Sequence, residues 1–159
     1  MKTLIIYYSY DGNTELVVNE LKPLLNADVL RLETIDEKKR TGLSKYAWGG
    51  SQIFMKARPK LKTFSTNFAD YDLIVLGTPV WAGTPAPAMN SFLHDAKLEG
   101  KKLALFVCHL GGKGHAIEKM SALCGGSTIL STTDFIQPSK MSGDQVKAAV
   151  SAWADKLKG

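Results

Sequence analysis

A short polar turn between an apolar run and a helical pattern has the composition of an anion-binding site. The turn covers residues 9–14, Ser-Tyr-Asp-Gly-Asn-Thr, and follows the apolar run 4–8. At such a turn the backbone N–H groups of the helix start point outward, and the positive end of the helix dipole lies behind them. Neutral side-chain donors are also present, from Ser9, Asn13 and Thr14. We therefore expect this turn to hold a phosphate.

The turn differs from the common polyphosphate loops. It lacks the Gly-Lys-Ser/Thr ending that places a lysine on a nucleoside polyphosphate, and it does not match G-x-G-x-x-G. Neutral donors without a cation suit a single phosphate monoester, and Gly12 permits a close approach. We expect the Asp11 carboxylate to point outward or to accept a bond from its own backbone in an Asx turn. The alternative is an ordinary strand-to-helix connection.

The elements that must position this turn alternate between strand and helix. Apolar runs at 4–8, 72–77 and 102–108 predict buried strands, while 27–32 and 128–135 predict two more. Helical patterns begin near Thr14, near Pro85 and near Ala116, and a last helix follows a Ser142 cap. Asn13 or Thr14 is the expected cap of the first helix, and Pro23 is expected to weaken or end its last turn. The pattern predicts one α/β domain, residues 1–159, with a doubly wound parallel sheet and helices on both faces.

Two further loops should reach the same edge of that sheet as the turn 9–14. They are the proline-rich stretch 78–87 and the glycine-rich stretch 110–115, which follow the third and fourth strands. In open parallel sheets, ligands bind beyond the carboxyl ends of the strands. His109 and His115 flank the glycine stretch, and we consider them weaker candidates for catalytic acids.

Composition narrows the classes of function. The chain has 159 residues, a net charge of +5 and 45% apolar residues, and no apolar run approaches the ~20 residues of a membrane span. We expect a cytoplasmic protein that binds neither membrane nor nucleic acid, and that is a monomer or a weak dimer. No cysteine cluster has zinc-ligand spacing, so Cys108 and Cys124 are expected to be reduced and buried. The segment 38–62 holds eight basic residues and no acidic one, so it forms either an anion-attracting surface or only a solvated face.

The two loops after the first and third strands resemble those of a known family. S-x-D-G-N-T at 9–14 resembles the S-x-T-G-N-T phosphate loop of flavodoxins, and G-T-P-V-W-A-G-T-P-A-P at 77–87 is similar to a loop of flavodoxin-like proteins. The resemblance implies a Rossmann-like, five-stranded sheet of order 2-1-3-4-5 with FMN bound at the switch point; flavodoxin is the standard example of that order.

The resemblance also implies which residues hold FMN. The phosphate would lie against Ser9, Tyr10, Asp11, Gly12, Asn13 and Thr14. The ribityl chain and the ring would lie against Thr78, Pro79, Val80, Trp81, Ala82 and Gly83, with Gly111 and Gly112 at the pyrimidine edge. Trp81 is the preferred aromatic neighbour of the ring, and Trp48 is a second candidate.

Two functions remain open at this point. The first is a flavodoxin-type electron carrier, in which FMN cycles between oxidised, semiquinone and hydroquinone forms and a redox partner protein exchanges electrons. The alternative is a flavodoxin-like NAD(P)H-dependent oxidoreductase of the quinone-reductase type, so whether the protein is an enzyme stays undecided. The chain departs from the family in being basic, in having Asp11 where threonine is usual, and in lacking the usual tyrosine loop near 108–112. We favour the carrier; a third possibility is a flavodoxin-like domain without flavin.

Overall fold

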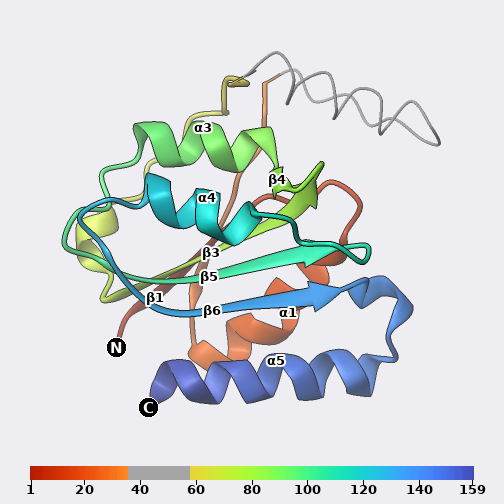
Figure 1. Cartoon of the computed structure of the whole chain (residues 1–159). Helices are drawn as coiled ribbons and strands as arrows, with labels where there is room; N and C mark the ends of the chain where they lie inside the picture. The colour runs from red at the N-terminus through yellow and green to blue at the C-terminus, as the bar shows by residue number, and fades with distance from the viewer. Residues whose placement is uncertain (36–57) are drawn as a thin grey trace.

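A parallel sheet of five strands organises the described part of the chain (Figure 1). The structure, a computed structural model, describes residues 1–35 and 58–159. In space the strands run β2 (Asp28–Arg31), β1 (Thr3–Tyr7), β3 (Leu73–Trp81), β5 (Lys102–His109) and β6 (Thr128–Ile136). A two-residue strand, β4 (Thr84–Pro85), pairs antiparallel with β3 and lies off this path. Without β4 the order is 2-1-3-4-5, which confirms the predicted topology.

Helices cover both faces of the sheet, as predicted (Figure 1). On one face α1 (Asn13–Leu25) packs beside α5 (Gly143–Lys158), and on the other lie α3 (Pro87–Asp95) and α4 (Ala116–Leu123). Two short 3₁₀ helices, η1 (Phe68–Asp70) and η2 (Pro138–Lys140), complete the described elements. The arrangement follows from right-handed crossovers between parallel strands, which place successive helices on opposite faces when the chain reverses direction across the sheet.

Alternation along β1 shows why its sequence is apolar throughout. Ile5 and Tyr7 join the core under α1 and α5, whereas Leu4, Ile6 and Tyr8 join the core under α3 and α4. All five side chains are at most 5% exposed. A strand buried on both faces needs apolar residues at odd and even positions. The edge strand β2 is instead largely exposed, in agreement with its mixed sequence.

Several predicted boundaries need correction. The N-cap of α1 is Gly12, in the left-handed region, with no side-chain cap, so the prediction of an Asn13 or Thr14 cap was wrong. Pro23 lies inside α1, which ends two residues later at Leu25. Residues 78–81 belong to β3 and not to a loop, and α3 begins at Pro87. The Ser142 cap is confirmed: its hydroxyl and the Gln145 side chain form a reciprocal capping box.

The long excursion between β2 and β3 lies mostly outside the described residues. Its two ends are joined by a bridge between Thr34 and Leu61. Within the described residues, no helix is long and apolar enough to cross a membrane.

Because the five long strands are parallel, their carboxyl ends meet at one edge of the sheet (Figure 1). Three of the connections that leave that edge are the turn between β1 and α1, the tip of the β3–β4 hairpin, and the segment between β5 and α4. This edge is the place where the sequence predicts a ligand site.

Candidate functional site

A small cleft of about 40 Å³ lies where these three connections meet. Its lining comes from the turn after β1, the end of β3 and the end of β5: Asp11, Asn13, Pro79, Val80, Trp81, Cys108, His109 and Leu110. The topology thus brings together chain segments about 70 and 100 residues apart in sequence.

The turn 9–14 is organised by its own side chains. The Ser9 hydroxyl accepts a hydrogen bond from the Glu15 amide at 3.3 Å. One Asp11 carboxylate oxygen accepts from the Asn13 backbone amide at 3.4 Å and from its side-chain amide at 3.2 Å. The bond to the backbone two residues on is the Asx-type contact expected for Asp11. Gly12 has φ = 93°, a conformation that strains other residues, and a Cβ placed there would meet no atom within 4 Å.

Thr14 carries the polar group of this turn that lacks a protein partner. Its residue is 1% exposed, and its hydroxyl makes no hydrogen bond of normal geometry. Burial raises the pKa of the adjacent Cys108 thiol to about 12, while hydrogen bonding from the nearby Thr14 hydroxyl lowers that pKa. Sulfur is a weak acceptor, so this hydroxyl has no strong acceptor within the protein. A buried hydroxyl without a partner is costly, so it is a natural donor for a bound group.

The Asn13 side chain bonds within the protein, whereas the sequence suggests that it is a donor for a phosphate. Its side-chain oxygen accepts a hydrogen bond from the Ser139 amide in η2 at 2.9 Å, while its amide nitrogen binds Asp11. Asn13 therefore connects the turn to the segment that leads into α5. Both polar ends of the Asn13 side chain have partners within the protein.

The outer side of the turn is fixed by an ion pair. Arg31 at the end of β2 contacts Glu15 at 2.6 Å and donates to the Ser9 carbonyl at 3.4 Å. The Tyr7 hydroxyl also donates to Glu15, at 3.2 Å. Burial and the neighbouring Glu15 carboxylate raise the pKa of Tyr7, so this phenol stays protonated at neutral pH.

The β3–β4 hairpin forms a second wall. Its two-residue tip, Ala82-Gly83, has φ of 49° and 71°, the positive values that tight hairpin turns require. Thr78 is fully buried: its hydroxyl accepts from the Ala86 amide at 3.2 Å and donates to the Pro79 carbonyl at 3.1 Å. Thr78 therefore holds the hairpin against the start of α3.

Trp81 forms the aromatic side of the cleft. Its ring meets Tyr8 edge-on at a centroid distance of 6.0 Å and Tyr10 at 5.5 Å. Edge-to-face pairs of this kind hold a ring in a defined orientation. The half-buried indole of Trp81 also lines the cleft itself.

A buried histidine orders the segment after β5. His109 is 7% exposed; its Nε2 lies 2.9 Å from Asp134 on β6, and its Nδ1 accepts from the Gly111 amide at 3.1 Å. That acceptor role places the ring proton on Nε2, where it is donated to Asp134. Lys113 pairs with the other oxygen of Asp134 at 2.9 Å. The hydrogen bonds from His109 and Lys113 hold the pKa of Asp134 below its usual value.

The hairpin tip and the glycine segment contact each other through their backbones. The His115 amide donates to the Gly83 carbonyl at 3.1 Å. A Cβ on Gly114 would lie 2.4 Å from the Gly83 Cα, and Gly114 has φ = 51°. Only glycine fits this crossing without displacing one of the two loops.

The predicted site residues differ in where the structure places them. Asp11, Asn13, Pro79, Val80 and Trp81 line the cleft, and Ser9, Tyr10, Gly12 and Thr14 belong to the turn that bounds it. Ala82 and Gly83 lie at the hairpin tip, Gly111 and Gly112 are exposed beyond β5, and Thr78 serves the hairpin internally. Trp48 lies outside the described residues.

Sequence reasoning missed part of the wall. Cys108 and Leu110 line the cleft, and His109 contributes through its position and not as an evident acid. Their place at the carboxyl end of an apolar strand was the available signal. Cys108 and Cys124 are both free and buried, as predicted. Among the described residues, no group of three His, Cys, Asp or Glu side chains could hold a metal ion.

Comparisons with solved structures agree on the fold. The chain resembles a flavoprotein from Lactobacillus acidophilus, solved in complex with FMN, at 23% identity and TM-score 0.73 over 84% of this chain and 92% of that one. A putative flavoprotein from Bacteroides eggerthii matches with 19% identity and TM-score 0.78 over 99% and 98% of the two chains. A flavodoxin, WrbA-like protein from Agrobacterium tumefaciens matches with 16% identity and TM-score 0.59 over 99% and 95%.

Comparison with curated protein sequences gives no significant match. The sequence model described as Flavodoxin matches residues 2–157, nearly the whole chain. This protein belongs to the flavodoxin family.

Proposed function

We propose that this protein binds FMN at the cleft between the turn 9–14, the β3–β4 hairpin and the end of β5, and that it carries electrons to or from a partner protein. Membership of the flavodoxin family supports this function, and the Lactobacillus relative was solved with FMN. The observation that carries the proposal for this chain is the buried Thr14 hydroxyl at the start of a helix, which makes no hydrogen bond of normal geometry within the protein.

The phosphate end of FMN would lie at the N-terminus of α1. Two of the first three helical amides already have acceptors, because Asn13 donates to Asp11 and Glu15 donates to Ser9. Within the described residues no hydrogen bond is found for the third amide, that of Thr14. Thr14 thus offers both an amide and a hydroxyl to an anion, and the open space at Gly12 leaves room for it.

The flat end of FMN would lie against the side of the cleft formed by Pro79, Val80 and Trp81. Edge-to-face contacts with Tyr8 and Tyr10 orient the Trp81 ring in this wall. His109 would fix the nearby backbone at Gly111 through its accepted hydrogen bond. FMN supplies the redox chemistry when bound, and the protein orients it and limits its contact with water.

A second candidate is an NAD(P)H-dependent flavodoxin-like oxidoreductase. Basic side chains between β2 and β3 favour this candidate: Arg58, Lys60 and Lys62 lie at the point where the described residues resume, and all three are exposed. The similarity to a WrbA-like protein keeps this alternative open. The same positive surface suits an acidic partner protein, which is the reading we prefer. A cytoplasmic location and a monomeric or weakly dimeric state remain part of the proposal.

The absorption spectrum of the purified protein tests FMN binding. A flavin band near ~450 nm, present at once or after FMN is added, is the expected result. Absence of that band after addition of FMN would contradict both candidates.

Anaerobic mixing with NADPH then separates the two. An electron carrier keeps its flavin colour in the absence of a partner protein, whereas a reductase loses it rapidly. Neutralising Arg58, Lys60 and Lys62 together should weaken partner binding and flatten its salt dependence, and Lys147→Gln on the exposed side of α5 is the control. Unchanged salt dependence would assign these cations to a solvated surface only.

A further inference from the structure

A second and much larger pocket lies away from the cleft. Its volume is about 680 Å³, within the range of small-molecule sites. It is bordered by the segment 58–68, by Ile35 and by the second half of α3 with the residues that follow it. Among the described residues, none lines both this pocket and the cleft at the carboxyl edge of the sheet.

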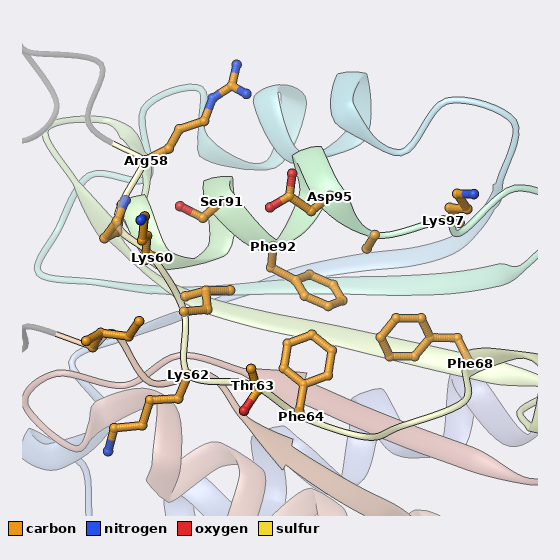
Figure 2. Close-up of a pocket in the computed structure, with 14 residues that line it drawn as sticks. Arg58, Lys60, Lys62, Thr63, Phe64, Phe68, Ser91, Phe92, Asp95 and Lys97 are labelled. Atoms are coloured by element: carbon orange, nitrogen blue, oxygen red, sulfur yellow. The ribbon is translucent and has the colours of Figure 1, made fainter.

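The floor of this α3 pocket is aromatic. Phe64 lies 6.1 Å from Phe92 and from Phe68, and Phe68 meets Phe92 edge-on at 5.7 Å, as centroid distances. Figure 2 shows the three rings turned toward one another beneath α3. Phe92 is 1% exposed but Phe64 is 39% exposed. An exposed phenyl ring next to a buried one offers a surface on which a flat ring can stack.

The rim of the pocket is cationic. Arg58, Lys60 and Lys97 line it, and none of them is in an ion pair with a described residue. Lys62 also lines the pocket but is paired with Glu33. Asp95 is the acidic side chain among the lining residues that the structure describes. Counted over the described part of the chain, three unpaired cations against one carboxylate give the rim a positive field that attracts anions.

A hydroxyl without a partner lies in the wall. Ser91 on α3 is 4% exposed, and its Oγ makes no hydrogen bond. In Figure 2 this hydroxyl points from α3 toward the segment that carries Arg58 and Lys60, the cationic end of the pocket. A buried helical serine usually finds an acceptor, so this free hydroxyl indicates a group that the pocket receives.

We propose that the α3 pocket binds a small planar aromatic molecule that carries one anionic group. The ring stacks on Phe64 over the floor of Phe68 and Phe92, and the anion lies at the Arg58–Lys60 end near the Ser91 hydroxyl. This site is additional to the FMN cleft, and binding there does not depend on whether FMN is bound.

Naphthalene-2-sulfonate is the probe, added to the full-length protein and followed by amide chemical shifts. Shifts concentrated at Phe64, Phe68, Ser91 and Phe92 are expected. Neutral 2-naphthol should bind at least about fivefold more weakly because it lacks the charge, and inorganic sulfate should not compete because it lacks the ring.

Three single substitutions test the parts of the site. Phe64→Ala should lower the affinity for naphthalene-2-sulfonate about tenfold and Arg58→Gln about threefold. The control Lys119→Gln on α4 should leave this affinity unchanged. Ser91→Ala should weaken binding about threefold without lowering the stability of the free protein, because no hydrogen bond is lost.

Specific outcomes would overturn the proposal. They are shifts outside the pocket, equal binding of 2-naphthol and the sulfonate, competition by sulfate, or a dimer whose interface buries Phe64. The FMN absorption band of each variant is recorded in parallel, so a failed aromatic site and a failed FMN site are distinguished.

Discussion

At the scale of single residues, the account depends on Thr14. Its hydroxyl is buried and without a partner in a turn whose other polar groups are largely satisfied within the protein. Such a group lowers the stability of the free protein and becomes useful only when a ligand accepts from it.

Thr14→Val should therefore affect binding and stability in opposite ways. The change removes the hydroxyl with little change of shape, so FMN affinity should fall about tenfold while the free protein unfolds at an equal or slightly higher denaturant concentration. Flavin titration and urea unfolding measure the two effects.

Thr3→Val is the matched control, because Thr3 also has a buried hydroxyl without a partner but lies at the other end of β1. It should leave FMN affinity unchanged. Equal losses of affinity in the two variants would mean that Thr14 acts through the fold and not through the ligand.

The ionisation of Asp134 makes the stability of the protein depend on pH. Its pKa is lowered by hydrogen bonds from His109 and Lys113, so the folded protein binds this proton less readily than the unfolded chain. Its contribution to stability is complete above the ordinary aspartate pKa of 3.8 and is lost as pH falls through the lower folded value.

Asp134→Asn should cost about 1 kcal/mol at pH 7, because it weakens the contacts to His109 and Lys113. The difference from the natural protein should shrink as pH falls below 3.8. Urea unfolding at several pH values measures it, and a difference that stays constant down to the acid transition would contradict the assignment.

At the scale of elements, two loops are locked together where Gly83 meets Gly114. The contact joins the β3–β4 hairpin to the segment between β5 and α4, and it requires a backbone without a Cβ. These are two of the three connections that form the cleft.

Gly114→Ala should destabilise the protein by about 2 kcal/mol or more, because the new Cβ would overlap Gly83 in a strained conformation. Gly112→Ala is the control: its Cβ would meet nothing within 4 Å, so the expected change is within about 0.5 kcal/mol. Denaturant unfolding measures the stability of both variants. Similar losses of stability would mean that the loss in Gly114→Ala does not come from the contact with Gly83.

At the scale of the whole molecule, the sequence predicts the sheet well because burial on both faces leaves continuous apolar runs. The apolar runs at β1, β3 and β5 predict these strands, whereas their order in the sheet was implied by the resemblance to flavodoxins. The β3–β4 hairpin was harder to predict, because prolines at 79, 85 and 87 suggested a loop. In the structure Pro79 still belongs to β3 and pairs with Cys108 of β5.

The candidate site was predicted in its segments but not in its contacts. Spacing cannot show that the Thr78 hydroxyl bonds within the hairpin, or that Asn13 is joined to Ser139, since both bonds depend on how distant segments pack. The α3 pocket could not be read from sequence for the same reason: Phe64, Phe68 and Phe92 come from separate elements.

The central claim is that the turn 9–14 holds the phosphate of FMN. Titration of the flavin-free protein with FMN and with riboflavin, which has the same ring but no phosphate, tests it most directly. The account predicts that FMN binds about 100-fold more tightly, since phosphate contacts to uncompensated donors contribute about 2.7 kcal/mol. Equal affinities for the two flavins, or binding of neither, would contradict it.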